Sequence, residues 1–141
     1  MPEPRPDRVA REEIFRRAAG CCEYCRSQER FSPDSFSVEH IIPRARGGGG
    51  DLENLALACQ GCNNRKYVEV AGIDPVSGLS ASLYHPRLQL WNDHFAWSAD
   101  GATIVGLTPT GRATIEKLEL NRPSLVALRR ILFDAGEHPP E

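Results

Sequence analysis

Two cysteine pairs with the same spacing constrain the fold of this chain more than any other feature. Cys22 and Cys25 are separated by two residues, and Cys59 and Cys62 repeat that spacing. A CxxC pair offers two thiolates from one tight turn, and two such pairs complete the tetrahedral four-cysteine site of structural zinc. The spacing therefore predicts that a structural Zn²⁺ ties two distant segments of the chain together.

The fifth cysteine favours metal binding over disulfide bonding. Five cysteines cannot all pair as disulfides, whereas four ligands and one remaining thiol fit a zinc site. Cys21 is the remaining residue because its spacing to Cys25 is the looser CxxxC, although it could replace Cys22 as a ligand. The proline-rich, polar N-terminus lacks an apolar signal core, so we expect a reducing, cytoplasmic location. No apolar run of membrane-spanning length exists, so no membrane partner is expected.

Length and charge set broader limits. The 141 residues predict one domain, or a small zinc-organised module with an appended C-terminal half. We expect the module to cover residues 1–72 and the extension to cover residues 73–141, packed on the same domain. The formal net charge of −2 counts against tight, non-specific DNA binding. It does not exclude DNA as a partner, because binding depends on where the basic side chains lie.

The first half predicts two helices and two strands. Asp7 is a suitable N-cap for a first helix, and Gly20 is typical of a helix end. The glycines at 47–50 predict a loop between two strands that can pass close to a ligand. The expected elements are a helix over residues 7–19, strands over 36–42 and 55–59, and a short helix over 63–70.

The second half predicts a hairpin and two more helices. Asp100-Gly101 suits the turn of a hairpin between residues 94–98 and 103–107. Thr110 can cap the next helix, and Pro123 suits the start of the last one. The fold class is therefore α+β. The residues of the last helix that we expect to face inward are Leu125, Leu128, Ile131 and Leu132.

An acidic residue followed by a histidine lies between the two cysteine pairs. Glu39 and His40 begin this series, Asn54 follows, and Asn63 comes directly after the last cysteine. With these residues, the stretch 22–66 resembles the HNH endonuclease family, whose ββα-metal fold places two strands and a helix around one catalytic metal. The matching residues are Cys22-Glu23-Tyr24-Cys25, Val38-Glu39-His40-Ile41-Ile42-Pro43, Gly47-Gly48, Asn54-Leu55 and Cys59-Gln60-Gly61-Cys62-Asn63-Asn64-Arg65-Lys66.

The resemblance is specific because the cysteine pairs and the acid–histidine pair occur together and in order. Residues 73–130 also look similar to the tail of small stand-alone bacterial HNH proteins. The resemblance assigns no chemical role to that tail.

The chemistry of these residues agrees with phosphodiester hydrolysis. A neutral imidazole can deprotonate water near pH 7, so we expect His40 to be the general base. Glu39 and Asn63 offer oxygen ligands, which favour Mg²⁺ or Mn²⁺ as a catalytic metal that stabilises the leaving group. Many family members have histidine in place of Asn63, which would favour Zn²⁺, Ni²⁺ or Co²⁺. The resemblance implies that Asn54 braces the loop between the strands and helps to position the histidine.

Basic and aromatic side chains supply candidate contacts to DNA. The basic residues that flank the expected site are Arg44, Arg46, Arg65 and Lys66, and we expect them to bind phosphates. An arginine cluster near the N-terminus could contact DNA or form a solvated helix face, and the sequence favours neither interpretation. The aromatic residues Trp91, Phe95 and Trp97 can stack on unpaired bases, but core packing of a hairpin is the favoured interpretation.

These patterns predict a zinc-containing HNH endonuclease that cleaves or nicks DNA with a divalent metal. The alternative is a non-catalytic, zinc-ribbon-like module that binds nucleic acid or protein. Glu39 and His40 discriminate between the two, because a binding module needs no general base beside a carboxylate. A redox CxxC protein is disfavoured because no thioredoxin-type βαβ pattern surrounds the cysteines.

Overall fold

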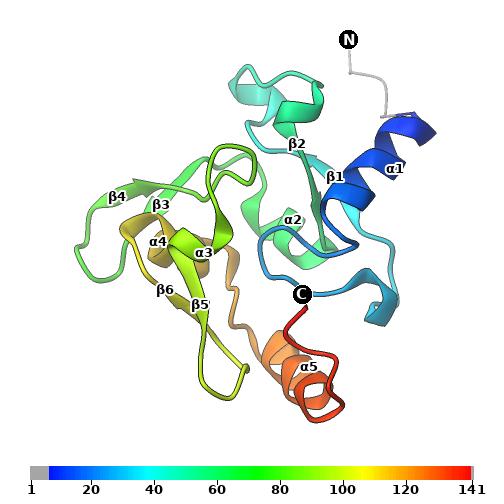
Figure 1. The fold of residues 1–141 in the computed structure, drawn as a ribbon. Coiled ribbons are helices and arrows are strands. Elements are labelled where there is room, and N and C mark those ends of the chain that lie inside the picture. Colours follow the sequence, from blue (N-terminus) through cyan, green and yellow to red (C-terminus); the bar gives the residue numbers. More distant parts are fainter. Residues whose placement is uncertain (1–6, 141) are drawn as a thin grey trace.

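The computed structural model describes residues 7–140 and shows three separate two-stranded sheets with helices around them (Figure 1). This mixture of helices and small sheets confirms the α+β class. In chain order the helices and strands are α1 (Arg8–Arg17), β1 (Ser37–His40), β2 (Leu55–Ala58), α2 (Gln60–Lys66), β3 (Ala71–Ile73), β4 (Ser80–Ser82), α3 (Trp91–His94), β5 (Phe95–Trp97), β6 (Ile104–Gly106), α4 (Pro109–Leu118) and α5 (Pro123–Asp134).

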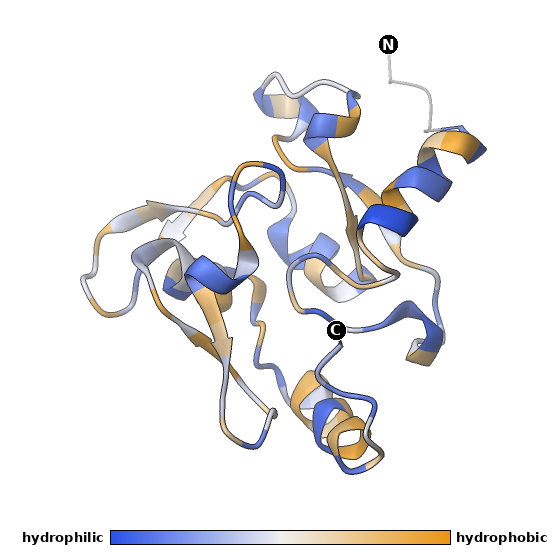
Figure 2. Cartoon of the chain, viewed as in Figure 1, coloured by the Kyte–Doolittle hydropathy of each residue, from blue (hydrophilic) through white to orange (hydrophobic). Residues whose placement is uncertain are grey.

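Helix α1 begins where the sequence predicts and ends at Arg17, two residues before the expected end at Ala19. The Asp7 carboxylate accepts a hydrogen bond of 2.8 Å from the Ala10 N–H, which satisfies one of the free donors of the first turn. Gly20 follows the helix with a φ of +70°, a conformation that glycine adopts without strain. Ile14 is buried and anchors the otherwise mostly hydrophilic helix (Figure 2). The helix packs against β2.

Strands β1 and β2 lie where two strands are predicted, and they pair as an antiparallel hairpin. Ser37 pairs with Ala58 at one end, and His40 pairs with Leu55 at the other. All four residues of β2 are buried, which explains why its sequence is continuously apolar rather than alternating. The order of strand, strand and helix matches the prediction. Helix α2 packs against β1.

The start of α2 corrects one expectation. The helix begins at Gln60, three residues before the predicted position at Asn63. The reason is that Cys59 acts as the N-cap, and its Sγ accepts a hydrogen bond of 3.4 Å from the Cys62 N–H. The second cysteine pair therefore lies across the first turn of the helix, and Asn63 lies inside the helix rather than at its start.

The second half contains one hairpin that the sequence predicts and one that it does not. Strands β5 and β6 pair as expected. The β3–β4 hairpin was not expected, because Ser80–Ser82 shows no apolar alternation. Helix α4 is capped by Thr108, whose Oγ1 accepts a 3.0 Å hydrogen bond from Gly111, so the expected cap at Thr110 is wrong. Pro109 fixes the first helical position instead.

Helix α5 begins at Pro123 as predicted, but its inward face differs from the expected one. Leu125 is buried, whereas Ile131 is 66 % exposed. Arg129 lies one turn after Leu125 on the same face and is only 4 % exposed. A charged side chain therefore occupies the centre of the face that we expected to be purely apolar.

The buried apolar residues form one cluster that draws on both halves of the chain. It includes Tyr24 and Leu57 from the first half and Trp91, Phe95 and Leu118 from the second. Trp91 and Phe95 are thus core residues, as favoured from the sequence. None of the helices in residues 7–140 is long and apolar enough to cross a bilayer.

Candidate active site and metal centre

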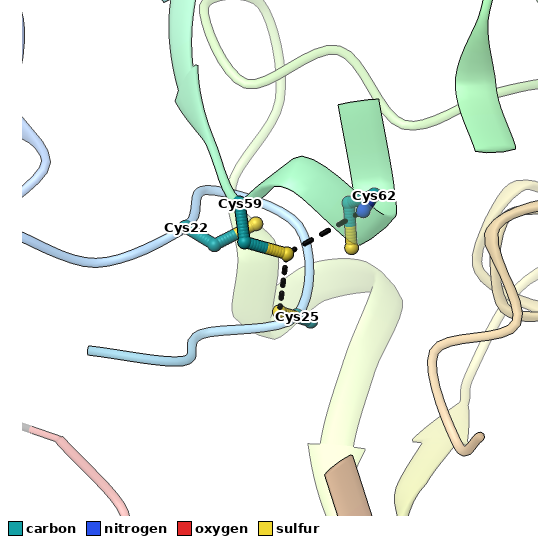
Figure 3. A group of neighbouring side chains, drawn as sticks. All are labelled: Cys22, Cys25, Cys59 and Cys62. Carbon is teal, nitrogen blue, oxygen red and sulfur yellow. Dashed lines mark hydrogen bonds between the residues drawn. The ribbon is translucent and has the colours of Figure 1, made fainter. Parts of the chain in front are cut away.

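The four cysteines of the two CxxC pairs converge on one point. Their sulfur atoms lie within 4.8 Å of one another, and all four residues are buried. Figure 3 shows the sulfurs turned toward a common centre, two from the loop after α1 and two from the N-terminal end of α2. The sulfurs of Cys25 and Cys59 lie 3.7 Å apart. Cys21 lies outside this group, with its thiol 3.5 Å from the Ala19 carbonyl oxygen.

The electrostatics of the cysteine cluster fit a bound cation. Burial raises the pKa of Cys22, because the protein interior disfavours the charged thiolate. Hydrogen bonds from Cys22 and the other thiols lower the pKa of Cys59. Crowded buried thiols cannot all ionise unless a positive charge joins them, and a coordinated zinc ion deprotonates its thiol ligands. Four convergent, buried thiols of this kind could hold a structural zinc ion.

His40 lies at the end of β1 with its backbone held from two sides. It pairs with Leu55 across the hairpin, and the Leu55 carbonyl also accepts a hydrogen bond from the Arg17 guanidinium. The Lys66 ammonium lies 3.4 Å from the His40 carbonyl oxygen and 2.7 Å from that of Ile41. The half-buried imidazole therefore projects from a fixed stretch of backbone.

Asn54 braces the loop that follows His40. Its Oδ1 accepts a hydrogen bond of 2.8 Å from the Ile42 N–H, and its Nδ2 donates to the carbonyls of Ile42 and Gly49 at 3.0 and 2.8 Å. A Cβ at Gly48 would lie 1.7 Å from the Ile42 carbonyl oxygen, so only glycine fits there. The amide thus closes the loop over the end of the strand, which is the geometry that an orienting role requires.

Glu39 is enclosed between β1, α2 and the first cysteine pair. One carboxylate oxygen accepts a hydrogen bond from the Tyr24 hydroxyl, and the other lies 3.3 Å from the Lys66 ammonium. Glu39 is 5 % exposed. Burial raises the pKa of Glu39, and the charge of Lys66 acts against that shift.

This enclosure does not fit the expected role of Glu39 as a metal ligand. Both carboxylate oxygens already have partners, and hydrated Mg²⁺ loses its water molecules reluctantly. In the observed arrangement, the positive charge beside Glu39 comes from the Lys66 ammonium. Asn63 lies half-exposed, one helical turn before Lys66 on α2.

The four basic residues expected to bind phosphates lie in different environments. Arg44 and Arg46 are exposed, and Arg46 is also bonded to the Val68 carbonyl at 2.6 Å. Arg65 is half-buried and pairs with Glu119 at 3.1 Å. Lys66 is only 1 % exposed, so its ammonium cannot reach a phosphate in this structure. The expectation for Lys66 failed because the sequence does not show whether a basic residue after the last cysteine faces solvent or the protein interior.

The structure also reveals charged and polar residues near the site that the sequence did not single out. Tyr24 lies between two cysteines and reaches Glu39. Glu23 forms an ion pair with Arg87 and accepts a 2.8 Å hydrogen bond from the Leu57 N–H. The residues between the cysteines of the first pair therefore link it to β1 and β2. The sequence offered one signal, the acidic and aromatic residues inside a turn that is otherwise built of cysteines.

One comparison bears on this site. Residues 22–69 match the family model described as HNH endonuclease. The matched range begins at the first cysteine of the cluster and includes His40, Asn54 and Asn63. A search of curated proteins found none that matches the chain.

Proposed function

Residues 22–69 form an HNH endonuclease domain, and from that premise we propose that the protein hydrolyses phosphodiester bonds of DNA. Membership of the domain in this family implies a nucleic-acid substrate. The observation that carries the proposal is the placement of His40, on a strand end whose backbone is held by Leu55 and Lys66 and whose following loop is closed by Asn54.

His40 acts in this proposal as the general base. A half-buried imidazole at a strand end can accept a proton from water beside a bound phosphate, and a fixed backbone limits the number of ring positions. Asn54 acts through the loop rather than on the substrate. Arg44 and Arg46 lie exposed on the turn that follows the same strand, and the Arg46 guanidinium also lies 3.6 Å from the Glu69 carboxylate.

We propose Mg²⁺ or Mn²⁺ as the catalytic metal, and its two expected ligands differ in their availability. Asn63 offers a carbonyl oxygen from a half-exposed position on α2, but Glu39 can join it only if the Lys66 ammonium moves away. While its carboxylate is paired with Lys66, Glu39 does not hold the metal in this proposal.

The direct test of function is incubation of supercoiled plasmid with purified protein and Mg²⁺ or Mn²⁺. We expect nicked or linear product that depends on the added metal and disappears with a chelator of divalent cations. A non-catalytic binding module, the alternative that the Glu39–Lys66 pair favours, would shift the mobility of DNA without any cleavage. Binding without cleavage under every metal would therefore reject the nuclease proposal.

Replacing Glu39 by glutamine is expected to separate a structural role from a ligand role. The change leaves the buried Lys66 ammonium without a negative partner, and breaking a buried pair costs about 3–5 kcal/mol. A second change, Lys66→Met, should recover much of that loss, because an uncharged pair avoids the penalty. Urea unfolding of the single and double variants measures both effects.

Asn63→Ala is the matched comparison, because Asn63 lies on the same helix in a half-exposed position. It should leave the free energy of unfolding nearly unchanged and raise the metal concentration needed for cleavage. If Glu39→Gln instead keeps its stability and alters only the metal dependence, Glu39 is a metal ligand and Lys66 must move.

Replacing Arg44 and Arg46 together by alanine is expected to weaken DNA binding in a salt-dependent way. Each lost phosphate contact should reduce the slope of log K against log salt by about 0.9. Fluorescence anisotropy of a labelled duplex at several salt concentrations measures this slope. Arg130→Ala, which removes an exposed arginine from α5, is the control and should leave the slope unchanged. Equal slopes for the double variant and the parent would remove both residues from the DNA contact.

A further inference from the structure

Arg122, in the C-terminal half of the chain, reaches the cysteine cluster. Its Nη2 lies 3.5 Å from the Cys59 Sγ, and its Nη1 lies 3.6 Å from the Cys62 Sγ. The residue is the N-cap of α5, between the two C-terminal helices. A single guanidinium therefore contacts both sulfur atoms of the second cysteine pair.

The position of this guanidinium is fixed by other contacts. Its Nη1 also lies 3.2 Å from the Leu118 carbonyl oxygen and 3.3 Å from that of Glu119, at the C-terminal end of α4. A Cβ at Gly61 would lie 2.4 Å from the Arg122 Nη2. The glycine between Cys59 and Cys62 thus leaves the space in which the guanidinium lies against the sulfurs.

A cysteine site that holds zinc carries a negative charge, which the Arg122 guanidinium can balance. Four thiolates and one Zn²⁺ together carry two negative charges, and a buried net charge is costly unless it is paired. Arg122 supplies one positive charge directly at the sulfurs. Arg129, 4 % exposed, supplies a second nearby, with its Nη2 3.4 Å from the Cys25 carbonyl oxygen. Both arginines come from the segment to which the sequence assigned no chemistry.

We propose that Arg122 is an outer partner of the cysteine-bound zinc. It donates hydrogen bonds to two of the four sulfurs, balances part of their negative charge and slows the loss of the metal. The C-terminal segment is then part of the metal centre. This proposal rests on the four-cysteine zinc site and is independent of nuclease activity.

Zinc release from the purified protein tests the proposal. Partners outside the ligand shell typically contribute 10-fold to 100-fold to metal affinity, so Arg122→Gln should lose zinc to a chromogenic chelator correspondingly more readily. Gly61→Ala should act in the same direction, because its methyl group displaces the guanidinium without removing it. Arg112→Gln is the matched control. It breaks a bidentate ion pair with Asp74 in the same half of the chain and should release zinc at the parental rate.

A spectroscopic readout separates contact with the sulfurs from a purely structural role. In protein loaded with Co²⁺ in place of zinc, the thiolate-to-metal charge-transfer bands report the electron density on sulfur. Loss of two hydrogen bonds should move these bands to lower energy in Arg122→Gln, with a smaller shift in Arg122→Lys, which keeps the charge but not the planar fork.

Parental zinc release and unshifted bands in folded Arg122→Gln would overturn the proposal. If that variant does not fold, Gly61→Ala decides the question, because it keeps Arg122. Faster zinc release with shifted bands in Gly61→Ala supports the proposal, and parental values of both refute it.

Discussion

Replacing Cys59 or Cys62 by serine is expected to release zinc and unfold the residues around the cysteine cluster, rather than only to slow a reaction. Structural zinc contributes about 10–16 kcal/mol of apparent binding free energy in small peptides, whereas a whole domain is stable by only about 5–15 kcal/mol. Cys59 also caps α2, a role that the serine hydroxyl can keep, so the stability lost in Cys59→Ser reports the metal rather than the cap. Elemental analysis and thermal unfolding measure both consequences.

Cys21→Ser is the control for the cysteine variants. Cys21 is as buried as the four clustered cysteines, but its thiol faces the Ala19 carbonyl rather than the other sulfurs. It should retain one zinc ion per chain and the parental melting temperature. Folded parental protein without zinc, or a Cys59→Ser variant that melts like the parent, would show that zinc is not what holds these segments together.

Replacing His40 by alanine is expected to reduce DNA cleavage by roughly 10²–10⁴-fold, the usual contribution of a general base. DNA affinity and zinc content should remain at parental values, because the change removes no zinc ligand and no candidate phosphate contact. The measurement is the initial rate of plasmid nicking with Mg²⁺ and with Mn²⁺, together with anisotropy of a labelled duplex and elemental analysis.

His94→Ala is the control for the histidine variant. His94 is also half-buried, but it is bonded to Thr108 at 2.6 Å and lies outside residues 22–69. It should cleave DNA at the parental rate, whereas the loss of cleavage in His40→Ala purified in the same way excludes a contaminating nuclease. Cleavage by His40→Ala at the parental rate would remove His40 from the mechanism.

Features that depend on short spacings could be predicted from the amino-acid sequence. The two CxxC pairs predicted which cysteines would converge, and the apolar run at residues 55–59 predicted the strand that forms over residues 55–58. Asp7 and Pro123 marked helix starts, because a cap or a fixed φ acts within one turn. Asn54 was expected to brace the loop, and its hydrogen bonds to Ile42 and Gly49 have the geometry of that role.

Which charged groups become buried partners could not be predicted from the sequence and is seen only in the folded chain. The sequence predicts that Glu39 binds a metal and that Lys66 binds phosphate. The packing of α2 against β1 instead encloses both residues and pairs them. No pattern in the sequence marks Arg122 or Arg129, yet the position of α5 brings them to the cysteines. Ile131 fits the apolar pattern and is nevertheless exposed, while Arg129 is buried.

Caps and cysteine pairs could be predicted and buried charges could not, because these interactions act over different ranges along the chain. Caps, turns and CxxC ligand pairs are set by neighbours within a few residues, so their pattern is visible in one stretch of sequence. An ion pair such as Glu39–Lys66, or a guanidinium beside a sulfur as at Arg122 and Cys59, joins residues far apart in the chain. Whether such a charge meets solvent or a partner depends on which faces pack together, and that is fixed only when the whole chain has folded.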